Sequence, residues 1–274
     1  MVQNSENRHK LSPELVFLGT GAGFQLPVFF CSCDVCEATR RHPEYRRTRA
    51  VAALIGEETT LIDAGPDLEF QLDRESIKQI DRIFVTHWHY DHVWGLGSLA
   101  GVWFATKSRP CDIYLPYQVQ HHFDQSFAYL RKSINLHPIR PGDRIELSDG
   151  TWEVVKCNHT DHSVGFIVES TQKFAYLVGS VPPAETVEKL KDLDLLIPEA
   201  TLDELDEDWR EFSLKEAVKF WRQTGIPRCI LTHLSCHSWK EGGLIAGMSH
   251  SERSAYETSV PGLIIAYDGM RVKL

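Results

Sequence analysis

Four side chains that can bind a metal ion fall within six consecutive residues: His87, His89, Asp91 and His92. They directly follow residues 82–86, an apolar and β-branched run that predicts a strand. Side chains alternate along an extended chain, so His87 and His89 are expected to point the same way. Asp91 and His92 can then approach from the other side as the chain leaves the strand. Imidazoles beside a carboxylate favour a hydrolytic metal centre over a purely structural one.

Two histidines later in the chain also follow predicted strands. His159 comes after the strand predicted over residues 152–157, and His233 comes after residues 229–232. A single histidine in such a place is a weak signal, although loops at strand ends often carry functional groups. Three strand-end histidine sites in one chain favour one shared metal centre. His162, three residues past His159, is a ligand, a proton donor or a surface residue.

A second metal-binding pattern is the spacing Cys-x-Cys-x-x-Cys formed by Cys31, Cys33 and Cys36. Three thiols at this spacing can converge on one structural zinc ion, which takes four ligands. The fourth is expected from elsewhere in the chain. Cys236 is the predicted fourth ligand, and the neighbouring His237 is the competing candidate.

The 274-residue chain has the composition of a soluble globular protein, with 42% hydrophobic and 24% charged residues. Its formal net charge of −9 argues against a general nucleic-acid surface, which would carry a basic face. The basic residues between positions 40 and 49 are either a solvated helix end or an anion-steering patch. No run reaches the ~18 apolar residues of a membrane helix, and residues 1–10 lack an apolar signal core. We therefore predict a cytoplasmic protein whose seven cysteines bind metal or stay reduced.

Apolar runs bounded by turn residues predict alternating strands and helices with no linker between domains. Strands are predicted over residues 15–18, 50–55, 59–62, 82–86, 144–147, 152–157, 165–168, 174–178, 193–197, 229–232, 263–266 and 270–274. Helices are predicted over residues 67–79, 92–106, 117–132, 183–191 and 214–224. Residues 1–12 are predicted to be a polar tail, and residues 13–274 one domain of two β-rich halves covered by helices. Residues 116–132 and 242–254 are expected to shape a pocket, the latter as a mobile lid or a surface loop.

The run His-x-His-x-Asp-His, together with Asp63, His159 and His233, resembles the metallo-β-lactamase superfamily. The resemblance implies an α/β fold, the four-layer αβ/βα sandwich, with metal ions at one edge. Within such a site, Asp63 is expected to orient a ligand histidine without binding the metal itself.

Further segments narrow the resemblance within this superfamily. They are the three-cysteine spacing of residues 31–36, Tyr45-Arg46-Arg47, Leu61-Ile62-Asp63-Ala64-Gly65, Leu231-Thr232-His233 and Tyr267-Asp268-Gly269-Met270. Together they resemble the phosphoribosyl cyclic phosphodiesterase of phosphonate breakdown and its relative, the B protein of pyrroloquinoline quinone biosynthesis.

One position departs from the phosphodiesterase pattern. Gly179 stands where that family carries an aspartate that bridges two metal ions, and a histidine after the next strand is also absent. Both departures resemble the quinone-pathway protein, which lacks the intact histidine run present here. A bridging carboxylate helps to hold two metal ions ~3.5–4 Å apart, so its loss predicts weaker occupancy of one position. Glu199 or Asp203 could supply a carboxylate instead, although an altered, mononuclear site is preferred.

The residues and the resemblance together predict a metal-dependent hydrolase of a small-molecule phosphodiester or cyclic phosphate. Its nucleophile is expected to be a metal-bound hydroxide, which Asp91 also orients, and His162 or His237 is the candidate acid. The active-site ligands, which suit Zn, Mn or Fe, are predicted to be His87, His89 and His159 for one ion and Asp91, His92 and His233 for the other.

Two alternatives to a hydrolase stay open from the sequence. One is an iron-dependent oxidoreductase, as the resemblance to the quinone-pathway protein suggests, because histidines with an open position can hold an oxygen-binding iron. The other is a binding protein with an altered metal site. The expected partner is a small-molecule substrate, with neither nucleic acid nor membrane favoured, and a homodimer is among the open oligomeric states.

Overall fold

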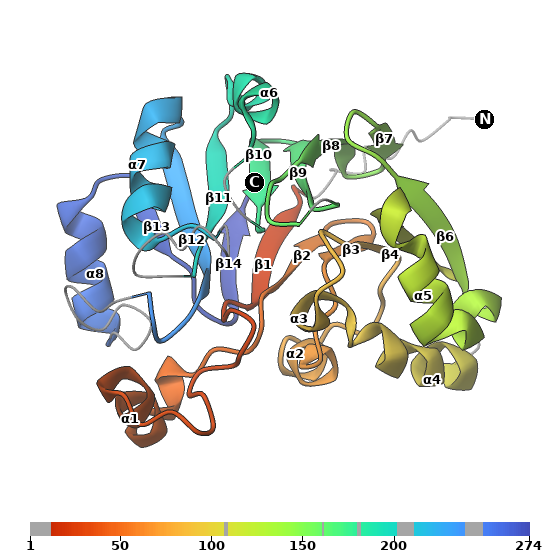
Figure 1. Ribbon diagram of the computed structural model, residues 1–274, viewed down its shortest axis with the longest axis horizontal. Helices are drawn as coiled ribbons and strands as arrows, with labels where there is room; N and C mark the ends of the chain where they lie inside the picture. Colours follow the sequence, from red (N-terminus) through yellow and green to blue (C-terminus); the bar gives the residue numbers. More distant parts are fainter. Residues whose placement is uncertain (1–11, 107–108, 161, 180–181, 202–210, 239–248) are drawn as a thin grey trace, which may run out of the picture.

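The computed structural model describes residues 12–106, 109–160, 162–179, 182–201, 211–238 and 249–274. Two seven-stranded sheets face each other, and helices cover their outer faces (Figure 1). This is the predicted four-layer αβ/βα sandwich, and the expected fold class is confirmed. Most of the predicted polar tail lies outside the described residues. Among the described helices, none is both long and apolar enough to cross a membrane.

The first sheet is antiparallel in one half and parallel in the other. Its strands, in spatial order, are β14 (Met270–Lys273), β1 (Glu14–Gly19), β2 (Val51–Ile55), β3 (Thr59–Ile62), β4 (Arg82–Phe84), β5 (Cys111–Pro116) and β6 (Ile134–Ile139). Neighbours are antiparallel from β14 to β3 and parallel from β3 to β6.

The second sheet repeats this division. Its strands, in spatial order, are β13 (Leu263–Ile265), β12 (Arg228–Leu234), β11 (Leu195–Ala200), β10 (Lys173–Leu177), β9 (Val164–Glu169), β8 (Gly150–Lys156) and β7 (Arg144–Leu147). Neighbours are parallel from β13 to β10 and antiparallel from β10 to β7. Parallel neighbours end at the same edge of a sheet, so each sheet gathers several strand ends in one place.

Twelve helical segments join the strands. They are α1 (Asp34–Arg41), η1 (Pro43–Tyr45), α2 (Leu68–Arg74), α3 (Tyr90–Val93), α4 (Leu96–Thr106), η2 (Tyr117–Val119), α5 (Gln120–Phe127), η3 (Ala128–Lys132), α6 (Ala184–Val187), η4 (Glu188–Leu190), α7 (Leu214–Thr224) and α8 (His250–Ser259) in the described chain. Helices α2 to α5 pack on the first sheet, and α7 and η4 pack on the second.

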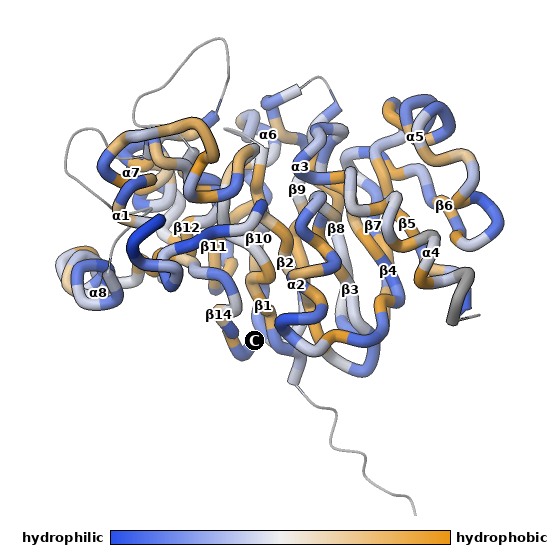
Figure 2. The backbone as a smooth tube through the Cα atoms, turned by 90° about the horizontal axis from the view of Figure 1, so that it is seen from below, coloured by the Kyte–Doolittle hydropathy of each residue, from blue (hydrophilic) through white to orange (hydrophobic). Residues whose placement is uncertain are grey.

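The two sheets are held together by aromatic side chains between them. Phe84 of β4 stacks on Trp152 of β8, with ring centroids 4.4 Å apart and planes 9° from parallel. On its other side Phe84 stacks on Tyr114 of β5, also at 4.4 Å. Figure 2 shows the orange, hydrophobic colour along the central strands β1, β2 and β4. Phe84 lies three residues before His87, so this packing fixes the strand that delivers the histidine run.

Several predicted boundaries are wrong, each for a local reason. The helix predicted over residues 92–106 is two helices, α3 and α4, because the chain turns at Gly95. The Gly95 N–H donates to the carbonyl of Ala64, and a Cβ on Gly95 would lie 2.1 Å from the carbonyl oxygen of Gly65. The helix predicted over residues 67–79 ends at Arg74.

Other elements were not predicted at all. Strand β5 is missing from the prediction although its buried residues alternate along the chain. Strand β6 lacks a clear apolar alternation and contains Pro138, which suits its place at the sheet edge. Helices α1 and α8 were predicted as loops. The predicted lid therefore has helix at residues 250–254, while residues 242–248 lie outside the described chain.

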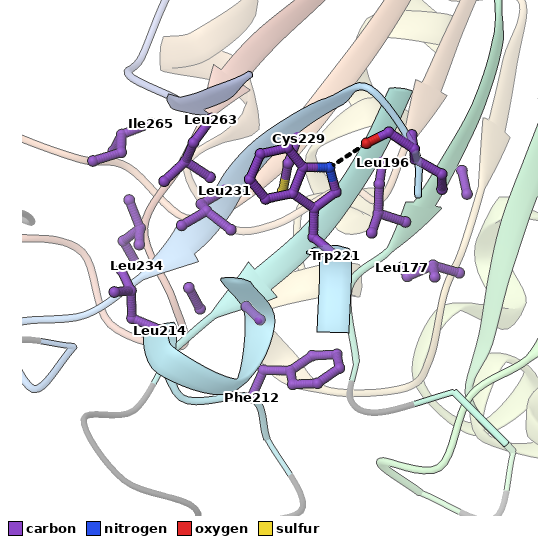
Figure 3. Close-up of a cluster of buried hydrophobic side chains, with 14 of the residues drawn as sticks. Leu177, Leu196, Phe212, Leu214, Trp221, Cys229, Leu231, Leu234, Leu263 and Ile265 are labelled. Carbon is purple, nitrogen blue, oxygen red and sulfur yellow. Dashed lines mark hydrogen bonds between the residues drawn. The ribbon is translucent and has the colours of Figure 1, made fainter. Parts of the chain in front are cut away.

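The Trp221 side chain of α7 offers a test of the packing on the second sheet. Its indole N–H donates to the buried carbonyl of Ile226 at 2.7 Å, within a cluster of apolar side chains (Figure 3). Trp221→Phe should lower the free energy of unfolding by about 1–3 kcal/mol, because the carbonyl loses its donor in an apolar setting. Urea unfolding measures this loss, and the half-exposed Trp94→Phe is the matched control, with an expected change within about 0.5 kcal/mol. Equal effects of the two variants would contradict this account.

Candidate metal centre

The predicted metal ligands reach one edge of the sandwich from the ends of several strands. His87 follows β4, His159 follows β8, and His233 lies at the end of β12. His233 and Asp63, which follows β3, both have left-handed backbone conformations, with φ of +56° and +66°. Such angles are uncommon for residues other than glycine and need the surrounding structure to hold them. They turn both side chains away from the strand direction.

The first group of donor atoms comes from His87, His89 and His159. The Nδ1 atom of His89 lies 3.1 Å from Nε2 of His87 and 3.1 Å from Nε2 of His159. Four ligands around one zinc ion, at bonds of about 2.05 Å, would be about 3.3 Å apart. The spacing therefore fits a shared metal ion. His89 is exposed, so this group faces solvent.

The second group comes from Asp91, His92 and His233. The Oδ2 atom of Asp91 lies 3.0 Å from Nε2 of His92 and 3.3 Å from Nε2 of His233. All three residues are buried. The two groups contain the six residues predicted as active-site ligands, and within each group the donor atoms lie within 4.8 Å of one another. Whether these residues bind metal stays a prediction.

Asp63 fixes the orientation of two of the histidines. Its Oδ2 atom accepts a hydrogen bond from Nδ1 of His92 at 2.7 Å, the kind of contact predicted for this residue. Its carboxylate also accepts from the backbone N–H and the hydroxyl of Thr86. Because the Thr86 hydroxyl donates to Asp63, its oxygen accepts from Nδ1 of His87 at 3.0 Å. Nδ1 therefore carries a proton in both rings, and each ring turns its Nε2 atom toward the donor groups.

Thr201 does the same for His233. Its hydroxyl donates to the backbone carbonyl of His233 and accepts from Nδ1 of the ring at 2.8 Å. Neutral histidine with a fixed tautomer is the form that binds metal, so the arrangement prepares His233 as a ligand.

The electrostatics differ between the two groups. Burial and the neighbouring histidines hold the pKa of His87 well below its ordinary value, so the ring is neutral. Burial also disfavours the charged form of His92, but Asp91 and Asp63 outweigh it and hold the pKa of His92 well above the ordinary value. The pKa of His233 is raised in the same way, against burial, by its contact with Asp91. Positive charge is therefore favoured where the second metal ion would sit.

Gly179, at the position where the resemblance implies a bridging aspartate, has a backbone conformation that favours glycine. Its φ is +113°, which L-residues rarely adopt, and a Cβ there would lie 3.6 Å from Nδ1 of His87. The Gly179 N–H donates to Oε2 of Glu199 at 3.0 Å. Glu199 is buried, 3.8 Å from Nδ1 of His233, on the side of that ring away from Asp91. Glu199 therefore belongs to neither donor group, and the alternative, Asp203, lies outside the described residues.

The four predicted zinc-loop cysteines also come together. The sulfur atoms of Cys31, Cys33, Cys36 and Cys236 lie within 4.8 Å of one another. Four thiols form a donor set that suits zinc. The structure places Cys236 in this group and leaves His237 exposed outside it. Cys36 lies in α1, so the predicted loop at residues 31–36 is partly helical. All seven cysteines lie in described residues and are free of disulfides.

The structure leaves some predicted residues apart and adds others. His162 is exposed and belongs to none of the groups found among the described residues, so its role as an acid stays a prediction. The sequence does not reveal that Thr86 and Thr201 orient ligand histidines, or that the carboxyl group of Glu211 is buried. Burial and the charge of Glu199 raise the pKa of Glu211 to about 7. Only the Thr-His pair at residues 86–87 gave a local signal.

Replacing Asp63 tests whether it prepares the ligand set. Asp63→Asn replaces one carboxylate oxygen, which accepts hydrogen bonds, with an NH2 group, which donates them. That NH2 group would face the N–H or O–H donors of Thr86 or His92, and a hydrogen bond would be lost. The affinity for zinc should fall about 10- to 100-fold, as when such supporting carboxylates are removed elsewhere. Competition with a zinc-binding dye measures this affinity. The control is Asp149→Asn, since Asp149 is a buried carboxylate that hydrogen-bonds Thr60 and Trp152 outside the donor groups. Equal losses in both variants would refute the role of Asp63.

The raised pKa of His92 predicts proton release when metal binds. Because that pKa lies above the ordinary value, the metal-free protein keeps a proton on His92 at neutral pH, and the metal ion must displace it. If zinc displaces one proton, its affinity should fall by about tenfold for each unit by which the pH drops below the raised pKa of His92. Calorimetry in two buffers with different ionisation enthalpies counts the protons. Binding without proton release at pH 7 would contradict the prediction.

Comparison with solved structures finds the same fold. A diphosphatase of the PhnP family matches with a TM-score of 0.80 and 25% identity, over 96% of this chain and 98% of that one. Zinc-bound PqqB from Methylobacterium extorquens matches with a TM-score of 0.76, over 95% of this chain and all of the other, and its 18% identity supports the fold alone.

Comparison with curated sequences finds relatives of several names. An octanoyltransferase of Porphyromonas gingivalis is 26% identical over 232 residues, which are 81% of this chain and 46% of that protein. A ribonuclease Z of Crocosphaera subtropica is 32% identical over 192 residues, 66% of this chain and 53% of that protein. The chain thus spans about half the length of these two relatives. The model of the beta-lactamase superfamily domain matches residues 58–234, well over half of the chain, and the protein therefore belongs to the metallo-β-lactamase superfamily.

Proposed function

We propose that this protein is a metal-dependent hydrolase that cleaves the phosphodiester or cyclic phosphate of a small molecule. The observation that carries the proposal is the presence of two donor groups at one edge of the sandwich. One group consists of three histidines, and the other consists of one aspartate and two histidines. The similar proteins support it, because the names diphosphatase and ribonuclease both describe breaking bonds between phosphorus and oxygen.

The chain supplies two positions for divalent ions such as Zn, Mn or Fe. His87, His89 and His159 would hold one, and Asp91, His92 and His233 the other. Bound there, a divalent ion acts as a Lewis acid toward the phosphate and makes water acidic enough to attack near neutral pH. A structural zinc ion is proposed for the four cysteines, where it would tie α1 to the loop after β12.

The side chains around this centre indicate how water is oriented and which side is open to substrate. Asp91 presents Oδ2 to both His92 and His233, so its carboxylate can orient an attacking water as well as a metal ion. His89 is exposed while the second group is buried, which puts the open side of the centre at the three-histidine group. His162 is exposed near His159 in the sequence and stays the proposed acid for the leaving oxygen.

A small substrate is preferred over a nucleic acid because of the charges. The chain carries a net charge of −9. Much of the basic cluster of residues 40–49 is used internally: Arg40 and Arg47 donate to backbone carbonyls, and Arg49 pairs with Asp67 at 3.0 Å. These contacts weaken the interpretation of the cluster as an anion-steering patch.

An iron-dependent oxidoreductase is the second candidate, favoured by Gly179. Gly179, with φ of +113° beside His87, supplies no carboxylate that could bridge two ions, and a single iron is then a reasonable occupant. Metal analysis of protein purified without added metal separates the candidates. Two active-site ions per chain favour hydrolysis, and one iron with oxygen consumption favours the alternative.

Hydrolysis of a generic aryl phosphodiester is the direct test. The zinc- or manganese-loaded protein should release nitrophenol from bis(4-nitrophenyl) phosphate, and a chelator should abolish the reaction reversibly. His233→Ala should lower kcat/KM at least about 100-fold, because it removes a ligand of the second group. His137→Ala is the control, since His137 pairs with Asp112 on the edge strand β6. Failure of the fully loaded protein on a broad panel of phosphodiesters would overturn the proposal.

A further inference from the structure

The short helix α3 has two functional faces. Asp91 and His92 point into the second donor group and are buried. Tyr90 and Trp94 lie four residues apart, which places them together on another face of the same turn. Their rings are 5.5 Å apart, and the residues are 51% and 49% exposed. Single exposed aromatic residues are ordinary, but two adjoining rings beside a row of metal ligands form a continuous apolar surface.

Both ends of this aromatic pair are held in place. The Arg49 guanidinium lies 5.6 Å from the centre of the Tyr90 ring. Arg49 is itself fixed by Asp67 and by the carbonyl of Gly23, which accepts from Nε at 3.1 Å. At the other end, Trp94 meets the buried ring of Phe127 edge-on, at 5.7 Å. Rings held in this way lose little conformational entropy when a ligand stacks on them.

The pair also lies next to the candidate metal centre. Tyr90 is bonded in the chain to His89 on one side and Asp91 on the other, so its Cα is about 3.8 Å from the Cα of a residue in each donor group. Gly23, which anchors Arg49, approaches Asp91 so closely that a Cβ on it would lie 3.8 Å from Oδ2. The aromatic pair and the donor groups are therefore carried by adjacent residues of one short segment.

The other tryptophans near the centre do not share this exposure. Trp88 packs against the core of the first sheet together with Phe123 and Phe127, and Trp103 is buried in the same core. Among these three tryptophans, Trp94 alone is half exposed. Of these three tryptophans, Trp94 is therefore the one that adds to the exposed aromatic surface beside Tyr90, a difference that the sequence alone does not reveal.

We propose that Tyr90 and Trp94 form a stacking platform for a planar ring carried by the substrate. The substrate of the proposed hydrolase would then be a phosphodiester with an aromatic ring on the group that is retained, either a nucleobase or a simple aryl ring. This inference rests on the proposed function for its substrate chemistry. The platform itself binds rings through their faces, which every nucleobase and aryl group offers.

Three substrates with one leaving group test the platform. Methyl, phenyl and thymidine-5′ esters of 4-nitrophenyl phosphate differ only in the retained group. Tyr90→Ala and Trp94→Ala should lower kcat/KM about 5- to 150-fold for the ring-bearing esters, as loss of a stacking partner does, and leave the methyl ester nearly unchanged. Tyr90→Phe should keep most of the activity. If the alanine variants lose activity on the thymidine ester alone, the platform recognises a nucleobase. If they lose as much activity on the phenyl ester, the platform accepts any aryl ring.

Phe70→Ala is the matched control, because Phe70 of α2 is also exposed, at 61%, and has an arginine, Arg74, 5.8 Å from its ring centre. It should change none of the three rates. Equal losses on all three esters in the platform variants would overturn the inference. If the loaded wild-type protein cleaves no diester, the proposed function fails, and binding of thymidine 5′-phosphate against methyl phosphate still tests the platform by calorimetry. In this binding experiment the inference fails if the wild-type protein does not prefer thymidine 5′-phosphate over methyl phosphate. It also fails if Trp94→Ala leaves that preference unchanged.

Discussion

The buried carboxylate of Asp63 is the contact on which the metal centre depends. Asp63 follows β3 in a left-handed backbone conformation. Its carboxylate accepts hydrogen bonds from Thr86 after β4 and from His92 on α3. One charged group thereby joins two neighbouring strands to the helix that follows them. Hydrogen bonds to a buried carboxylate are strong, and an unpaired carboxylate there would be very costly, so the three segments are fixed together. The orientation of His87 and His92 follows from this one residue, directly for His92 and through Thr86 for His87.

The opposite side of the centre is held by a different carboxylate. Glu199 is buried at the end of β11 and accepts from the Gly179 N–H, so it stabilises the glycine turn after β10. The turn has a backbone conformation that disfavours any side chain, including an aspartate. Negative charge is therefore present near His233, but on the outer side of the ring. The second group thus has Asp91 as its single carboxylate ligand candidate among the described residues.

The fold class is predicted through the resemblance to the superfamily, and the centres of the donor groups are predicted because they are encoded locally. The alternation His87-x-His89 and the cysteine spacing of residues 31–36 need only a strand end or a short turn to converge. The partners of these ligands depend on contacts between distant segments, such as Thr201 with His233, 32 residues apart, and periodicity cannot reveal them. The edge strand β6 was missed for a related reason: its pairing with β5, and not an apolar alternation, makes it a strand. Gly179 was recognised from the resemblance, but its left-handed φ comes only from the structure.

The helical turn α3 separates two requirements that would otherwise conflict. Successive residues of a helix are rotated by about 100°, so the side chains of Asp91 and His92 can face the donor groups while those of Tyr90 and Trp94 face elsewhere. The ligand positions are fixed by the geometry of the metal and by Asp63. Tyr90 between the ligands and Trp94 after them carry no such constraint, and their side chains can change without moving a ligand. In this chain both are aromatic, half exposed and anchored by Arg49 and Phe127. The histidine run and the two residues that follow it can therefore set the chemistry through one face of α3 and the choice of substrate through another.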